Sequence, residues 1–108
     1  MSRTFGIQVK LKAAPGKGDR LAQIMLEVAA IIEHLPGCQT FIVMQALADP
    51  DEVLITEVWD NQQTHQASLT NKQVLDLINA SRYIITQMEH QAGRPINQEH
   101  MRLRPICA

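Results

Sequence analysis

The sequence predicts an α+β fold in which one antiparallel sheet is covered by helices on one face. Some segments are strand-like, because apolar and polar residues alternate in them or because they are rich in β-branched residues. Between them lie segments whose apolar residues recur every three or four positions, as in an amphipathic helix. With 108 residues, of which 45% are hydrophobic, the chain fits one globular domain, and we expect that domain to span residues 1–108.

The first strand is predicted where apolar residues alternate with glycine or polar ones, at Phe5, Ile7, Val9 and Leu11. A turn at residues 15–18 breaks this strand. An amphipathic helix follows, with an apolar stripe at Leu21, Ile24, Met25, Val28, Ile31, Ile32 and Leu35. Leu35-Pro36-Gly37 ends this helix, because proline cannot continue the hydrogen-bond ladder and glycine tolerates a left-handed turn.

Two apolar, β-branched-rich runs come next, Thr40–Ala48 and Glu52–Asp60. The residues between them, Asp49-Pro50-Asp51, favour a tight turn, so the two runs predict a hairpin. Both runs carry apolar residues on both faces, which indicates that neither face of the hairpin is left to water.

The second helical segment is predicted in two parts. Asp60 is an acceptable N-cap for a short helix over Asn61–Leu69, and Thr70 or Asn71 can cap a second helix. The apolar stripe of that second helix consists of Val74, Leu75, Leu77, Ile78, Ile84, Ile85 and Met88. After a loop at Gly93-Arg94-Pro95, a polar edge strand is predicted over Glu99–Ile106.

This order of elements, βαββαβ, is that of a ferredoxin-like sandwich, with the helices on one face of the sheet. The other face would then carry an apolar patch on two adjacent strands, formed by Ile42, Met44, Leu54 and Val58. Because the predicted helices already cover the first face of the sheet, a second copy of the chain is the simplest way to bury this apolar patch. We therefore predict a homodimer that packs sheet to sheet.

Charge and cysteine content exclude several classes of function. Ten Lys and Arg against eleven Asp and Glu give a net charge of −1 with no basic run, so nucleic acid is not an expected partner. The apolar runs are shorter than the roughly 20 residues that span a bilayer, and residues 1–8 do not read as a signal peptide, so we expect no membrane partner and a cytoplasmic location. Cys38 and Cys107 lack metal-site spacing, so reduced thiols and no metal are expected.

A series of short motifs resembles the antibiotic biosynthesis monooxygenase family, specifically its short quinol monooxygenases. In order, they are Pro36-Gly37-Cys38, Phe41, Val43, Asp49-Pro50, Glu57-Val58-Trp59-Asp60 and His65-Gln66-Ala67-Ser68-Leu69. The resemblance covers nearly the whole chain. It implies a dimeric α+β barrel with a pocket between sheet and helices in each subunit. It also implies that aromatic polyphenols are oxidised in this pocket by molecular oxygen, with no metal or flavin cofactor.

The chain departs from the family pattern at two places. Many members carry a histidine where this chain has Ser68, and here the imidazole comes earlier, at His65. Haem-degrading relatives carry an asparagine and a histidine near the positions of Val9 and Leu69, so haem chemistry is disfavoured.

His65 and Trp59 are the candidate catalytic residues. The unperturbed pKa of histidine, about 6.5, suits His65 to abstract a phenolic proton, although a histidine on a short helix can equally face solvent. Trp59, the only tryptophan, could wall an aromatic pocket by stacking, or could simply belong to the core.

Four further residues are candidates for substrate binding: Glu57, Ser68, Arg82 and Tyr83. Glu57 could exchange protons if it faces the pocket, or it could pair structurally with Arg82. Ser68 shares a helical face with His65 and could orient it or a substrate hydroxyl, or only cap the helix. Arg82 and Tyr83, expected in mid-helix, could reach a carboxylate and a polar ligand, or lie at the solvent rim.

The function that these features predict is a cofactor-independent monooxygenase whose substrates are a small aromatic quinol or polyphenol and molecular oxygen. Because triplet oxygen reacts slowly with closed-shell molecules, the substrate itself must supply electrons after deprotonation. Two other classes remain open. One is a non-redox isomerase of a small phosphorylated signalling metabolite, for which Arg82 is the obvious cation, and the other is a non-catalytic dimeric module that binds a small molecule.

Overall fold

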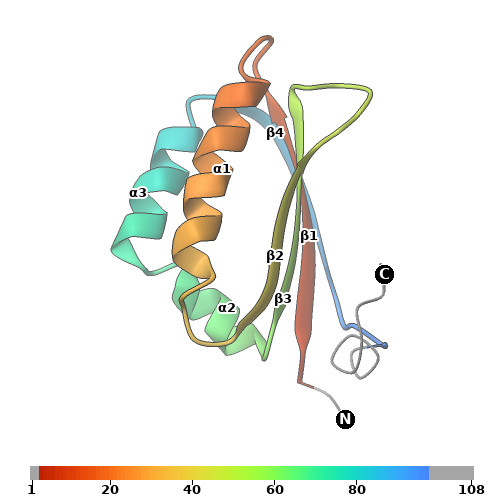
Figure 1. The fold of residues 1–108 in the computed structure, drawn as a ribbon, viewed down its shortest axis with the longest axis vertical. Helices are drawn as coiled ribbons and strands as arrows, with labels where there is room; N and C mark the ends of the chain where they lie inside the picture. The colour runs from red at the N-terminus through yellow and green to blue at the C-terminus, as the bar shows by residue number, and fades with distance from the viewer. Residues whose placement is uncertain (1–2, 98–108) are drawn as a thin grey trace.

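The computed structural model describes residues 3–97, and Figure 1 shows how their strands and helices are arranged. In chain order the elements are β1 (Phe5–Ala13), α1 (Gly18–Ile32), β2 (Cys38–Gln45), β3 (Glu52–Trp59), α2 (Gln62–Ser68), α3 (Lys72–Ser81) and β4 (Ile85–Gly93). This succession confirms the predicted ferredoxin-like α+β fold, including a second helical segment in two parts.

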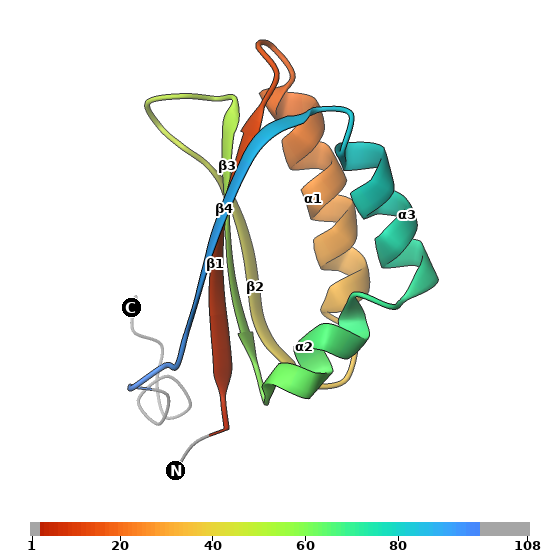
Figure 2. The same ribbon diagram turned by 180° about the vertical axis from the view of Figure 1, so that it is seen from behind.

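The strands form one sheet in the order β2-β3-β1-β4, and every neighbouring pair is antiparallel. The register places Phe5 of β1 opposite Trp59 of β3, and Cys38 of β2 opposite Trp59 on the other side. Figures 1 and 2 show the three helices on the same side of the sheet, with α2 near the end where β1 begins. We call the helix-covered side the inner face and the opposite side the outer face.

The core lies between the helices α1 and α3 and the inner face. Its fully enclosed members include Leu21 and Ile24 from α1, Val53 and Trp59 from β3, and Val74 from α3. Burying one such aliphatic side chain contributes about 2 kcal/mol to folding. The predicted stripe of the first helix is confirmed for Leu21, Ile24, Met25, Val28 and Ile32, which are buried. Ile31 is only partly buried, and Leu35 lies beyond the end of α1 at Ile32.

The prediction that the second long helix continues to Met88 is wrong. Helix α3 ends at Ser81, whose hydroxyl donates a hydrogen bond to the Ile78 carbonyl, and Ile85 already belongs to β4. Met88 therefore lies on a strand, paired with Leu11. The strand predicted over Glu99–Ile106 lies outside the described residues, and the fourth strand of the sheet is formed earlier, by Ile85–Gly93.

The outer face is apolar on one half and polar on the other. On β2, the side chains of Ile42 and Met44 are each about half exposed, at 48% and 49%. On β1 and β4 the outward positions are polar, and Lys10 forms ion pairs with Glu52 at 3.3 Å and Glu89 at 3.9 Å. None of the helices described within residues 3–97 is long and apolar enough to cross a membrane.

Candidate functional site

The end of β3 and the start of α2 form the centre of the site. Trp59 is the last residue of β3 and is completely buried. Asn61 then caps α2, because its side-chain oxygen accepts a hydrogen bond of 2.8 Å from the backbone N–H of Thr64. The N-cap is thus Asn61 rather than the predicted Asp60, whose carboxylate instead accepts a bond of 2.6 Å from the Gln39 amide.

A glycine fixes how closely α2 approaches the sheet. Gly37 has a positive φ of 89°, and a Cβ atom on it would lie only 2.6 Å from the Thr64 side chain. The absence of a side chain at position 37 therefore lets the first turn of α2 pack directly on the loop before β2. This close contact fixes the distance of α2 from the sheet, and therefore the position of His65 relative to β3.

Three side chains meet on the inner face: Glu57, Trp59 and His65. The indole Nε1–H of Trp59 donates a hydrogen bond of 2.9 Å to Oε1 of Glu57, and Nε2 of His65 lies 3.8 Å from the same oxygen. The Glu57 and His65 side chains are 10% and 13% exposed. The structure thus brings together three of the six residues that the sequence singles out, and Glu57 has Trp59 and His65 as partners rather than Arg82.

Aromatic rings hold the imidazole in place. The His65 ring lies 5.1 Å from the Phe5 ring, at a tilt of 36°, and meets Trp59 edge-on at 5.8 Å. Phe5 was not among the predicted site residues. The signal that could have identified it is strand pairing, because an antiparallel β1 and β3 place Phe5 beside Trp59.

Burial shifts the protonation equilibria of this group. It raises the pKa of the Glu57 carboxyl, while the hydrogen bond from Trp59 opposes part of that rise. It lowers the pKa of His65, because the imidazolium form loses solvation. The pKa of the neighbouring Cys38 thiol is raised, first by burial and then by the negative charge of Glu57.

The other predicted residues do not join this group directly. Ser68 is buried, and its hydroxyl donates a hydrogen bond of 2.6 Å to the backbone carbonyl of His65. It therefore stabilises the turn of α2 that carries the imidazole. Arg82 and Tyr83 follow the end of α3, in the link to β4, which Figure 1 shows at the opposite end of the sheet from α2. Both side chains are exposed, Tyr83 at 94%.

The inner face is only partly covered. Among the elements described within residues 3–97, strand β4 has its main contacts with β1, and its residues from Thr86 to Gly93 are exposed. By strand alternation, Met88, His90 and Ala92 lie on the same side as Leu11, Val9 and Ile7, their partners on β1. This open part of the inner face adjoins Phe5 and His65, so a flat ligand placed there would reach the imidazole.

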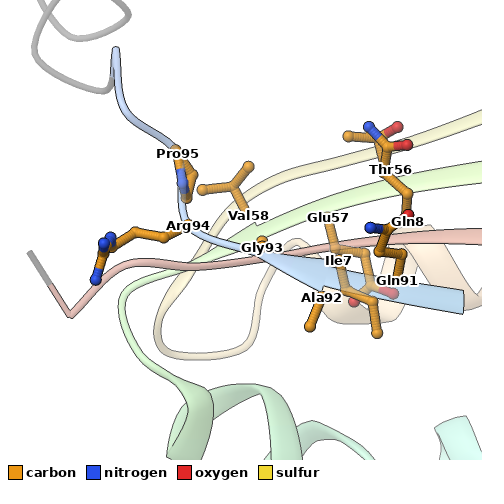
Figure 3. A pocket seen from close by; sticks show the side chains of 11 residues that line it. Ile7, Gln8, Thr56, Glu57, Val58, Gln91, Ala92, Gly93, Arg94 and Pro95 are labelled. Carbon is orange, nitrogen blue, oxygen red and sulfur yellow. The ribbon is translucent and has the colours of Figure 1, made fainter.

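Two grooves lie on the outer face. One, of about 410 Å³, is lined by Gly6, Gln8, Thr56, Val58, Gln91 and the segment Gly93–Pro95, among others. Figure 3 shows Val58 and Thr56 on one side of the sheet and Glu57 and Ile7 on the other. A second groove, of about 470 Å³, lies beside it between Met44, Leu54 and Glu89. Within residues 3–97, no three His, Cys, Asp or Glu side chains cluster in a way that could hold a metal ion.

The sequence matches the family model described as antibiotic biosynthesis monooxygenase over residues 4–80. No curated protein matches the sequence.

Solved structures share both fold and, in part, sequence with this chain. A protein of Chloroflexus aurantiacus, described as an antibiotic biosynthesis monooxygenase, is 38% identical, with a TM-score of 0.79, over 86% of this chain and 93% of its own. One of Deinococcus radiodurans, described in the same way, is 25% identical, with a TM-score of 0.76, over 84% and 91%. SnoaB of Streptomyces nogalater, a cofactor-independent oxygenase, shares the fold at 14% identity, with a TM-score of 0.77, over 87% and 94%.

Proposed function

Because this chain belongs to the antibiotic biosynthesis monooxygenase family, we propose that it is a cofactor-independent monooxygenase acting on an aromatic quinol or polyphenol. Family membership supports monooxygenase-type chemistry. The observation that supports the choice of an ionisable aromatic substrate is the position of His65, beside Phe5 at the open part of the inner face. SnoaB, whose fold this chain shares, offers a precedent for oxygenation without a cofactor.

The proposed reaction converts a quinol and molecular oxygen to a hydroxyquinone and water. His65 removes a phenolic proton, which makes the aromatic ring electron-rich enough to reduce oxygen. One oxygen atom then forms a bond to ring carbon, and the other leaves as water with two hydrogens from the substrate. The substrate supplies all the electrons, so no external reductant is needed.

The other residues act through His65 or the substrate in this proposal. Trp59 is fully buried, so we assign its role to the hydrogen bond that orients Glu57, rather than to stacking on the substrate. Ser68 keeps the His65 turn in place through the His65 carbonyl. Arg82 and Tyr83, at the other end of the sheet, would contact the substrate only if it extends along the whole of β4.

We also propose that two copies of the chain pair through their outer faces. The half-exposed Ile42 and Met44 and the two outer grooves form a surface that a second sheet would fill. The polar half, with Lys10 and Glu89, would supply the rim of such an interface.

Oxygen uptake with a panel of quinols tests the proposed function. We expect uptake by the wild-type protein after removal of metals and flavins, with no increase when either is added back. His65→Ala should lower the rate about 100-fold, which is typical for the loss of a general base. His34→Ala is the matched control, because the His34 side chain is exposed and its ion-pair partner is Glu33 rather than Glu57. Absence of uptake with every quinol would contradict the oxygenase assignment, and unchanged uptake by H65A would remove His65 from it.

A further inference from the structure

The group around Glu57 contains more than the single base that the proposed function requires. Oε1 of Glu57 lies between two ring nitrogens, Nε1 of Trp59 at 2.9 Å and Nε2 of His65 at 3.8 Å. The indole can only donate, so its hydrogen bond favours the carboxylate form and fixes which oxygen faces the imidazole. The sequence spacing alone does not provide this geometry, because it depends on how α2 folds back over β3.

The imidazole remains able to exchange protons. Within residues 3–97, no buried side-chain nitrogen or oxygen atom lacks a hydrogen-bond partner, and neither ring nitrogen of His65 forms a direct hydrogen bond. Both nitrogens therefore keep some contact with solvent. The 3.8 Å separation between His65 Nε2 and Glu57 Oε1 is too long for a direct hydrogen bond, but catalytic hydrogen bonds are often this long without substrate and shorten when it binds.

Few other charges act on this pair. Among the described residues, the only ion-pair partner of Glu57 is His65. One neighbouring strand contributes a titratable group, Cys38 on β2, on whose thiol Glu33, Asp60 and Glu57 all act. The inward side chains of β1 and β4 at this level are apolar: Phe5, Ile7 and Ala92. His90 is the next titratable group along the inner face of β4.

We propose that Glu57 is a positioning residue that shares protons with His65 and stabilises its imidazolium form. This inference rests on the proposed function for its catalytic meaning, but not for the pairing itself. In the working form, Glu57 is ionised and His65 is neutral. When His65 accepts the phenolic proton, the carboxylate at 3.8 Å balances the new positive charge, and the proton later leaves with the water that is formed.

The two groups then titrate as a unit. Burial favours the neutral form of each, which brings their pKa values closer together than those of free glutamate and histidine. The oxygenase rate should therefore rise with pH as the pair loses its second proton, because only then is Glu57 ionised while His65 is neutral. The apparent pKa of that rise belongs to both residues.

Nuclear magnetic resonance titration of ¹⁵N-labelled histidine tests the pairing without any substrate. The His65 signal is assigned by its disappearance in H65A. In Glu57→Gln, which keeps an oxygen acceptor for Trp59, we expect the His65 pKa to fall by about one unit or more, because the stabilising carboxylate is gone. Glu52→Gln is the matched control, since Glu52 lies on the same strand but pairs with Lys10 on the outer face.

A second measurement uses the wild-type protein alone. The ¹³C signal of the Glu57 carboxyl should titrate in two steps, one of which coincides with the His65 midpoint. An unchanged His65 pKa in E57Q, or a Glu57 signal that is insensitive to His65, would overturn the proposal.

Kinetics then connect the pair to the reaction. E57Q should lower kcat about tenfold and move the acidic limb of the pH–rate profile, while KM changes less than about twofold. A merely structural role would leave the pH profile in place. If the His65 titration responds to E57Q but no quinol is oxidised, the pairing stands and the proposed function fails. If quinols are oxidised but the His65 pKa is unchanged in E57Q, only the proposed pairing fails.

Discussion

Glu57 is the only acidic side chain that is buried among residues 3–97. Its place on β3 could be filled by an aliphatic residue, as Ile55 fills the preceding inward position. A carboxyl group there costs folding free energy, because the ionised form loses solvation and is only partly compensated by Trp59. Such a cost is typical of residues retained for chemistry rather than for packing.

The pH dependence of the free energy of unfolding should reveal the raised pKa of the Glu57 carboxyl. Its folded-state pKa is raised above the usual value of 4.5, so the stability that it contributes is complete below that pH and is lost as the pH rises through the folded pKa. Glutamine does not ionise. We therefore expect the free energy of unfolding of E57Q, relative to wild type, to increase from about pH 4 to about pH 8 in urea titrations.

His65 contributes with the opposite sign. Its pKa is lowered, so its contribution is present above the usual value of 6.5 and is lost as the pH falls through the folded pKa. In E57Q the His65 pKa is expected to fall further, so the variant loses more stability at low pH, and this change adds to the expected increase with the same sign. An equal pH-dependent gain in Glu52→Gln, whose carboxylate is on the outer face, would contradict the assignment to Glu57.

Part of this site could be predicted from single residues. Glu57 and Trp59 are two positions apart on a strand, so they share a face, and the apolar run around them indicates that the face is buried. The side-chain direction of His65 could not be predicted, because it depends on the close packing of Thr64 on Gly37. Arg82 was a wrong partner for Glu57 because the helix expected to carry it ends at Ser81.

Helix α2 is short, and its position depends on contacts at its first turn. The Asn61 cap begins the helix, and Gly37 allows Thr64 to approach the loop before β2. Isolated helices of seven residues are not stable in water, so these tertiary contacts hold the helix that carries His65.

Two glycine substitutions test the contribution of this contact. Gly37 and Gly16 both have positive φ angles, of 89° and 79°, so alanine at either position costs about 1 kcal/mol in backbone strain. A Cβ at Gly37 also overlaps the Thr64 side chain, whereas none is met at Gly16. Thermal unfolding should show Gly37→Ala to be less stable than Gly16→Ala by about 1–3 kcal/mol. Equal losses would mean that the approach of α2 is not tight.

The elements themselves were largely predictable. Alternation identified β1, the hairpin turn identified β2 and β3, and helical spacing identified α1, since each pattern matches the period of its structure. The failure at α3 has a physical cause: Ile84, Ile85 and Met88 continue the helical spacing of Leu77 and Ile78. The β-branched run Ile84-Ile85-Thr86 and the alternation of Met88, His90 and Ala92 are the strand signals that compete with it.

The molecule as a whole has one face covered by helices and one that is open. Four apolar residues on β2 and β3 were predicted on the open face, and Ile42 and Met44 are indeed about half exposed there. Val58, in contrast, is only 7% exposed. The proposed pairing of two copies would bury the exposed part of this surface.

Light scattering of the purified protein tests the pairing. We expect a mass of two chains for the wild type and of one chain for Met44→Lys, because a charge at the centre of the apolar half would be buried without a partner. Leu26→Lys is the matched control, since Leu26 is 52% exposed but belongs to helix α1. A monomeric wild type, or a dimer that persists in M44K, would contradict the outer-face pairing.

The most direct test of the proposed oxygenase activity is the fate of labelled oxygen. The metal-free and flavin-free protein is incubated with ¹⁸O₂ and the quinol that supports the fastest oxygen uptake, and the product is analysed by mass spectrometry. We expect one ¹⁸O atom in each hydroxyquinone molecule, with the second in water, and loss of this product in H65A. A product that carries no ¹⁸O, or that forms equally fast in H65A, would contradict the proposed oxygenase reaction.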